Sequence, residues 1–152
     1  MNALAWTEEL RLNQPQMDKT HEEFVKLLAM TRAAIDGGDR AGALATFQHL
    51  IEHTVQHFGT EERWMRAIGF EPDNLHAQQH NDVLRAMRAA MRMASEEERW
   101  EPIGVAITEL TQWFPLHARM MDADLVLCMA KVGFDPVRGE FMQRRAGTAV
   151  AP

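Results

Sequence analysis

The segment His57-Phe58-Gly59-Thr60-Glu61-Glu62-Arg63-Trp64-Met65 decides how this chain of 152 residues is expected to fold. His57 and Glu61 are four residues apart, so on an α-helix they lie about 40° apart around the axis and one turn along it. They share one helix face with the apolar stripe of the surrounding residues, Phe47, Ile51, Thr54, Phe58 and Met65. Burying an unpaired imidazole and carboxylate costs several kcal/mol, so this face needs a compensating partner.

Three more segments carry the same helical period of apolar residues, and strand-like alternation is absent. The period predicts four helices, at about residues 18–36, 39–67, 72–94 and 102–131. Residues that stop, cap or open helices mark these boundaries: Gly37, Gly38, Gly69 and Gly133 as stops, Asp39 as a cap, and Pro72 and Pro102 as openings.

Short connections between such helices favour antiparallel neighbours, so we expect an all-α fold, an up-down-up-down four-helix bundle. The chain is expected to form a single domain over residues 1–152. Residues 1–16 are expected to be an extended arm that Pro15 separates from the first helix. The tail 133–152 is expected to add a short helix near Arg138 to Arg144, with Ala146 to Pro152 disordered.

Composition excludes several classes of protein. Hydrophobic residues make up 46% and charged residues 25%, which is ordinary for a globular protein, and no stretch near 20 residues is free of charge. The net charge of −6, with scattered basic residues, argues against nucleic-acid binding. The start lacks the pattern of a signal peptide, and Cys128 is the single cysteine, so we expect a cytoplasmic protein without a disulfide. A monomer is expected.

Histidine interrupts every one of the four apolar stripes. His21 lies on the first, His57 on the second, His76 and His80 on the third, and His117 on the fourth. With Glu61 and an aspartate of the fourth helix, these are five imidazoles and two carboxylates. One metal rarely takes seven such ligands, but two irons bridged by two carboxylates use all of them. Imidazole with carboxylate suits iron, and the lack of thiolate pairs argues against a structural zinc site.

Spacing alone leaves two candidates for the second carboxylate. Asp122 lies five residues after His117, which places it about 140° around an α-helix. Asp124 lies seven residues after His117 and falls nearly on the same stripe, so simple helical geometry prefers it.

At this point the chain resembles a known family, the hemerythrins. The segment from His57 to Met65 is similar to their HFxxEExxM segment, and His76-x3-His80 and Trp113-x3-His117-x4-Asp122 follow in the same order. Met17-Asp18-Lys19-Thr20-His21-Glu22-Glu23-Phe24 resembles the opening motif of the bacterial single-domain branch. The resemblance covers roughly residues 6 to 135, and it favours Asp122 over Asp124.

The resemblance implies a ligand set and a function. His76, His80 and His117 would hold one iron, and His21 and His57 the other, which keeps an open position. Glu61 and Asp122 would bridge the irons together with an oxo or hydroxo oxygen. Members of the family bind dioxygen reversibly, end-on at the open iron as hydroperoxide. We therefore expect a non-enzymatic oxygen carrier, store or sensor.

The family's oxygen pocket is apolar, and six residues are candidates for it here: Phe24, Phe58, Trp113, Phe114, Ala118 and Met121. A dry pocket disfavours charge separation and so slows permanent oxidation of the iron. We place Phe24 and Trp113 beside the open iron as a hypothesis.

Other functions stay open on the same fold. A di-iron oxidase or peroxidase is the first, but ferritin-like sites use two Glu-x-x-His motifs, and no glutamate here lies three residues before a histidine. Nitric-oxide scavenging, iron handling, or sensing with an unidentified oxygen-using or signalling partner are the others.

The remaining notable residues have ordinary interpretations. His49 and His53 are expected at the surface or behind the metal ligands, and Glu62 in solvent. Asp18 and Asp73 are interpreted as first-turn helix charges, which could also bond to an imidazole. Cys128 is expected in the core. Three methionines of the third helix are expected to pack against neighbouring residues or lie at the surface: Met87, Met91 and Met93.

Overall fold

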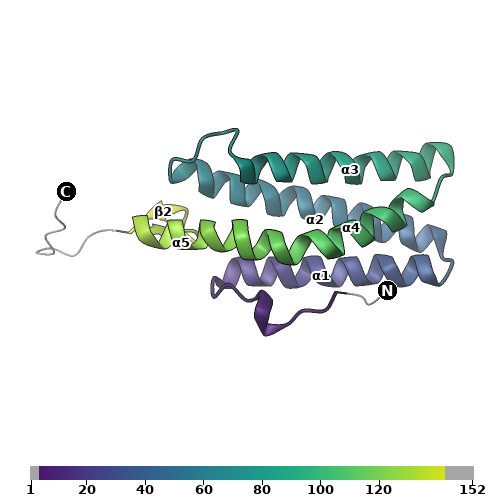
Figure 1. Cartoon of the computed structure of the whole chain (residues 1–152), viewed down its shortest axis with the longest axis horizontal. Coiled ribbons are helices and arrows are strands. Elements are labelled where there is room, and N and C mark those ends of the chain that lie inside the picture. Colours follow the sequence, from purple (N-terminus) through teal and green to yellow (C-terminus); the bar gives the residue numbers. More distant parts are fainter. Residues whose placement is uncertain (1–3, 143–152) are drawn as a thin grey trace, which may run out of the picture.

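The computed structural model describes residues 4–142. Its main elements are helices that follow one another along the chain (Figure 1): α1 (Pro15–Asp36), α2 (Arg40–Ala67), α3 (Leu75–Glu97) and α4 (Glu101–His117). The fourth helix continues without a break in direction through a π-helical segment, η2 (Ala118–Asp122), into α5 (Ala123–Val132). A short 3₁₀ helix, η1 (Glu8–Leu10), precedes them, and two short strands follow, β1 (Phe134–Asp135) and β2 (Glu140–Phe141).

Each helix of the bundle packs antiparallel to the next, and α1 also packs on α4, which closes the bundle. The connections are short, as up-and-down bundles require. The expected all-α four-helix bundle is therefore confirmed. No helix within residues 4–142 is long and apolar enough to cross a membrane.

Two helix starts differ from the sequence prediction. Pro15 is the first residue of α1 and does not hold the arm apart from it, because proline lacks the N–H that goes unused at this position. The side chain of Gln14 caps the helix by accepting a hydrogen bond from the Met17 amide. The third helix begins at Leu75, not near Pro72, because the Asn74 side chain accepts from Ala77 and serves as the cap.

The arm before α1 is not simply extended. It contains η1, whose Leu10 is buried against the bundle. Farther along, the Leu12 amide donates a hydrogen bond of 2.7 Å to the Asp18 carboxylate. Asp18 therefore ties the arm to α1 and does not serve an imidazole.

The segment after Gly133 forms a hairpin, so the helix predicted near Arg138 is wrong for the residues described. Gly133 ends α5 with a φ of +72°, a conformation that glycine adopts without strain. Phe134 and Phe141 then pair across the two antiparallel strands, with ring centroids 5.3 Å apart. The region predicted as disordered, 146–152, lies outside the described residues.

The core has two parts. The larger apolar cluster fills the half of the bundle near the α1–α2 turn, and its members include Phe24, Leu28, Phe47, Leu50, Met87, Ile103 and Ile107. The smaller cluster lies at the opposite end and consists of Met17, Trp64, Met65, Leu125, Met129 and Phe134. Between them lies a layer of buried polar side chains. Cys128 was expected in the core but is only half-buried, since Leu125 and Met129 take the inward positions of α5.

Candidate metal centre

The polar layer between the two apolar clusters contains all seven side chains that the sequence singled out. Each is at least 93% buried, which is unusual for ionisable groups without a partner. They come from every helix of the bundle: His21 from α1, His57 and Glu61 from α2, His76 and His80 from α3, His117 from α4 and Asp122 from the end of η2.

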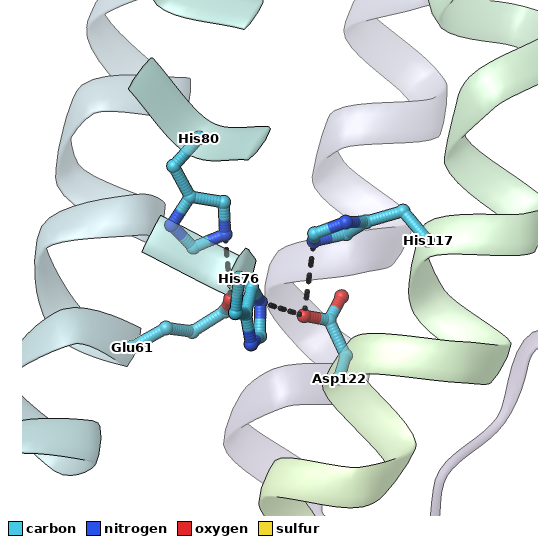
Figure 2. Close-up of side chains that lie close together, drawn as sticks. All are labelled: Glu61, His76, His80, His117 and Asp122. Atoms are coloured by element: carbon cyan, nitrogen blue, oxygen red, sulfur yellow. Dashed lines mark ion pairs between the residues drawn. The ribbon is translucent and has the colours of Figure 1, made fainter. Parts of the chain in front are cut away.

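These side chains form two overlapping groups, within each of which the possible ligand atoms lie within 4.8 Å of one another. One group is drawn in Figure 2 and comprises Glu61, His76, His80, His117 and Asp122. The other comprises His21, His57, Glu61 and Asp122. Both carboxylates belong to both groups, so three imidazoles lie on one side and two on the other.

Glu61 presents one oxygen to each side. Its Oε1 lies 3.2 Å from the Nε2 atoms of both His76 and His80. Its Oε2 lies 2.8 Å from the Nε2 of His57 and 3.8 Å from that of His21. A carboxylate with its two oxygens turned toward two ligand groups is arranged as a bridge between two metals would be.

The two oxygens of Asp122 also face different groups of imidazoles. Its Oδ1 lies 2.9 Å from the Nε2 of His76 and 3.3 Å from that of His117. Its Oδ2 lies 3.0 Å from the Nε2 of His21. The two carboxylates therefore join the same two groups of imidazoles.

The protein groups alone do not satisfy one another. Although they are close, both oxygens of both carboxylates lack hydrogen-bond geometry, as do the Nε2 atoms of the surrounding imidazoles, His21, His76, His80 and His117. A metal cation can compensate buried nitrogen and oxygen atoms that converge on one place without hydrogen-bond partners. The donor set therefore fits a site for two metal ions.

The protonation of these groups reflects their mutual dependence. Burial would lower the pKa of His21, but the nearby carboxylates of Asp122 and Glu61 favour the protonated ring, outweigh burial and raise that pKa to about 9. The same balance raises the pKa of His76 to about 9. Burial and the Glu61 charge would raise the pKa of Asp122, yet the surrounding imidazoles hold it below its usual range. The pKa of Glu61 is also held well below its usual value, against burial, by His57 and the other imidazoles.

The π-helical segment explains why Asp122, and not Asp124, faces inward. A π-helix bonds each amide to the carbonyl five residues before it, as the Ala123 amide does with Ala118. This wider turn lets both His117 and Asp122 point into the bundle, while Asp124 is exposed. Pro115, three residues before the segment, removes one regular hydrogen bond of α4, and a proline inside a helix was the available signal of irregularity.

The sequence did not predict the two residues that support the imidazoles, Glu62 and Gln79. The Nδ1 of His80 lies 3.1 Å from the Glu62 carboxylate, and the Nδ1 of His117 lies 2.8 Å from the Gln79 side-chain oxygen. Glu62 was expected in solvent but is only one-third exposed. Such bonds hold the Nδ1 proton, so that Nε2 is free to bind a metal. That each metal-binding imidazole needs a hydrogen-bond acceptor at Nδ1 could have been expected from the sequence, but residue spacing does not show which residue provides it.

Aromatic rings fix the same two imidazoles. Phe58 stacks on His80 with ring centroids 3.7 Å apart, and Trp113 stacks on His117 at 4.1 Å. On the other side of the centre, Phe114 packs edge-on against His21 at 5.0 Å.

The predicted pocket residues differ in burial and in place. Phe24, Phe58, Phe114 and Ala118 are buried, whereas Trp113 and Met121 are half-buried. Phe24 packs on Phe114, which in turn contacts His21 of the two-histidine side. The sequence hypothesis placed Trp113 with Phe24 near His21 and His57, but Trp113 stacks on His117 of the three-histidine side. The ring that contacts His21 is that of Phe114.

The other candidates lie outside the centre. The Nε2 of His53 lies 3.4 Å from the Glu23 carboxylate, and its ring stacks loosely on His57. His49 is exposed. Asp73 contributes a backbone oxygen that accepts from Gln78.

Comparison with known proteins agrees with this geometry. Residues 14–127 match the family model described as the hemerythrin HHE cation binding domain. A bacteriohemerythrin of Ralstonia nicotianae is 31% identical over 136 residues, which are 89% of this chain and 95% of that protein. Those of Pseudomonas paraeruginosa and Stenotrophomonas maltophilia are 25% and 22% identical, over 83% and 78% of this chain and 81% and 76% of theirs. The chain therefore belongs to the hemerythrin family of cation-binding domains.

Proposed function

We propose that this chain binds dioxygen reversibly at a pair of non-haem irons and acts as an oxygen carrier, store or sensor, not as an enzyme. The observation that carries the proposal is the division of each carboxylate, Glu61 and Asp122, between a group of three imidazoles and a group of two. A ferrous pair would supply the electrons that make oxygen binding possible and reversible.

Iron is the metal that the donor set favours. Five imidazole nitrogens and two carboxylates suit iron, and within residues 4–142 no second cysteine approaches Cys128 to make a thiolate site. His76, His80 and His117 would hold one ion, and His21 and His57 the other. Since the second ion receives one imidazole fewer, it keeps a position for a small ligand.

The surroundings of the two-histidine side suit a small apolar ligand. Phe114 covers His21 with its ring edge, and Phe24 packs behind Phe114. Both phenylalanines are at most 2% exposed. By excluding water they would disfavour charge separation at the ligand, which keeps binding reversible and slows permanent oxidation.

The imidazoles of the three-histidine side are held more firmly. Glu62 accepts a hydrogen bond from the Nδ1 of His80, and Phe58 stacks on that ring. Gln79 accepts from the Nδ1 of His117, and Trp113 stacks on that ring. These contacts fix ring orientation and leave Nε2 to the metal. This side of the centre is suited to retaining its ion while the ligand exchanges on the other side.

The proposal is tested by loading the full chain with ferrous iron under nitrogen, counting iron per chain, and recording absorption spectra through cycles of air and nitrogen. We expect two irons per chain and a visible band that forms in air and disappears under nitrogen. A band that forms once and converts to a permanently oxidised spectrum would identify an oxidase or peroxidase instead. Absence of stoichiometric iron would refute the metal centre itself.

A pair of aspartate variants tests the bridge. Asp122→Asn removes a charge that faces both imidazole groups, so we expect the iron content to fall from two per chain to one or fewer. Asp124→Asn is the matched control, because Asp124 is exposed two residues away and should keep two irons. Equal iron content in the two variants would contradict a bridging role for Asp122.

The raised pKa values of His21 and His76 predict how the iron-free protein responds to pH. Both groups keep a proton up to about pH 9 when folded but only to 6.5 when unfolded. The stability from this difference is fully present below pH 6.5 and is lost as pH rises through 9. Urea unfolding should therefore show a falling free energy of unfolding from pH 6.5 to 9. Iron-loaded protein should lack this fall, because metal replaces the protons, and equal slopes for both forms would contradict it.

Two leucine variants test which aromatic residue protects the ligand. We expect Phe114→Leu to speed autoxidation, because Phe114 covers His21 on the two-histidine side. Trp113→Leu should leave the autoxidation rate nearly unchanged, because Trp113 contacts only the other side through His117. The rate is measured from the decay of the oxygenated band, and a greater effect of the Trp113 variant would reverse the assignment.

A further inference from the structure

A groove between α3 and α4 lies outside the metal centre but touches its supporting residues. Its volume is about 420 Å³, within the range that protein pockets for small ligands occupy. Ala86 on α3 and Ala106 on α4 both line it, and their small side chains leave room between the two helices. Trp113 forms part of its wall.

The polar residues of the groove are acidic or neutral. Asp82 and Glu109 contribute carboxylates from opposite helices, and neither lysine nor arginine belongs to the lining. Asp82 also meets Arg85 at 3.4 Å, but both side chains are more than 70% exposed, so this ion pair is weak. Two carboxylates and a tryptophan side chain in the same lining favour a cation with an apolar body, and they disfavour an anion.

The groove is connected to the metal centre through two contacts. Gln79, which lines the groove, accepts a hydrogen bond of 2.8 Å from the Nδ1 of His117 through its side-chain oxygen. Trp113 stacks on the same imidazole, with an angle of 24° between the rings. A molecule in the groove would therefore touch both residues that orient His117.

We propose that the α3–α4 groove binds a small organic amine in its protonated form, with its apolar body against Trp113 and its charge between Asp82 and Glu109. Occupancy of the groove shifts the environment of the His117 ring through Gln79 and Trp113. The class of ligand follows from the residues of the groove alone and does not rest on the proposed dioxygen binding.

Three probes with the same ring and different charge test the ligand class: phenethylammonium, phenethyl alcohol and 3-phenylpropionate. Titration calorimetry on the full chain should show saturable binding of the cation, at least about tenfold tighter than that of the anion. The double variant Asp82→Asn/Glu109→Gln should weaken cation binding about tenfold. The matched control Glu96→Gln/Glu97→Gln, at the far end of α3, should leave it unchanged. Equal affinity for cation and anion would refute the proposed class.

The place of binding is tested separately. Ala86→Trp, at an exposed position of the lining, fills the groove and should abolish binding, whereas Ala130→Trp, on the exposed face of α5, should not. Zinc replaces iron for this measurement, because zinc is diamagnetic and leaves the nuclear magnetic resonance signals sharp. In the zinc-loaded protein, phenethylammonium should shift the ring signals of Trp113 and His117 but not those of His21. Binding that survives Ala86→Trp would refute the site, and an unshifted His117 would refute the connection. Neither readout uses oxygen, so these experiments can succeed or fail whether or not the protein binds oxygen.

Discussion

The structure depends on one constraint, the burial of five imidazoles and two carboxylates in the middle of a four-helix bundle. Charged and polar groups in such a place cost several kcal/mol each unless they are compensated. Apolar clusters above and below the polar layer hold the helices together, so the layer itself need not contribute to hydrophobic stability. The polar layer instead provides nitrogen and oxygen atoms whose burial a bound metal can compensate.

The two sides of the layer differ, and the difference has chemical meaning. On one side the imidazoles of His80 and His117 are fixed by Nδ1 hydrogen bonds and stacked rings. On the other side no residue of the described range 4–142 bonds to the Nδ1 of His21, whose ring contacts that of Phe114 edge-on. The difference between a side with three imidazoles and a side with two is the asymmetry on which the proposed function rests.

The fourth helix shows how the backbone adapts to this layer. Regular α-helical geometry cannot turn His117 and a carboxylate five residues later toward the same centre. The π-helical segment makes this possible at the expense of regular hydrogen bonding, and it begins three residues after Pro115, where the regular pattern is already interrupted. An irregular segment of this kind is typical of functional sites.

The amino-acid sequence by itself determined the fold class and the identity of the buried polar residues. Apolar residues at helical spacing specify four amphipathic helices, because each must bury its apolar face, and histidines on those faces mark a shared polar layer. Helix ends at Gly37, Gly69 and Gly133 followed from the local preference of glycine. These features depend on residues close together in the chain, which is why they could be read without a structure.

Only the tertiary structure decided what depends on contacts between distant segments. The partners Glu62 and Gln79 are separated from their imidazoles by 18 and 38 positions in the chain, so no local pattern could pair them. The family resemblance favoured Asp122 over Asp124 against simple helical spacing, and only the structure showed the π-helical turn that lets Asp122 face inward. The hairpin after Gly133 forms because Phe134 packs into the smaller apolar cluster, a contact that exists only once the bundle has assembled.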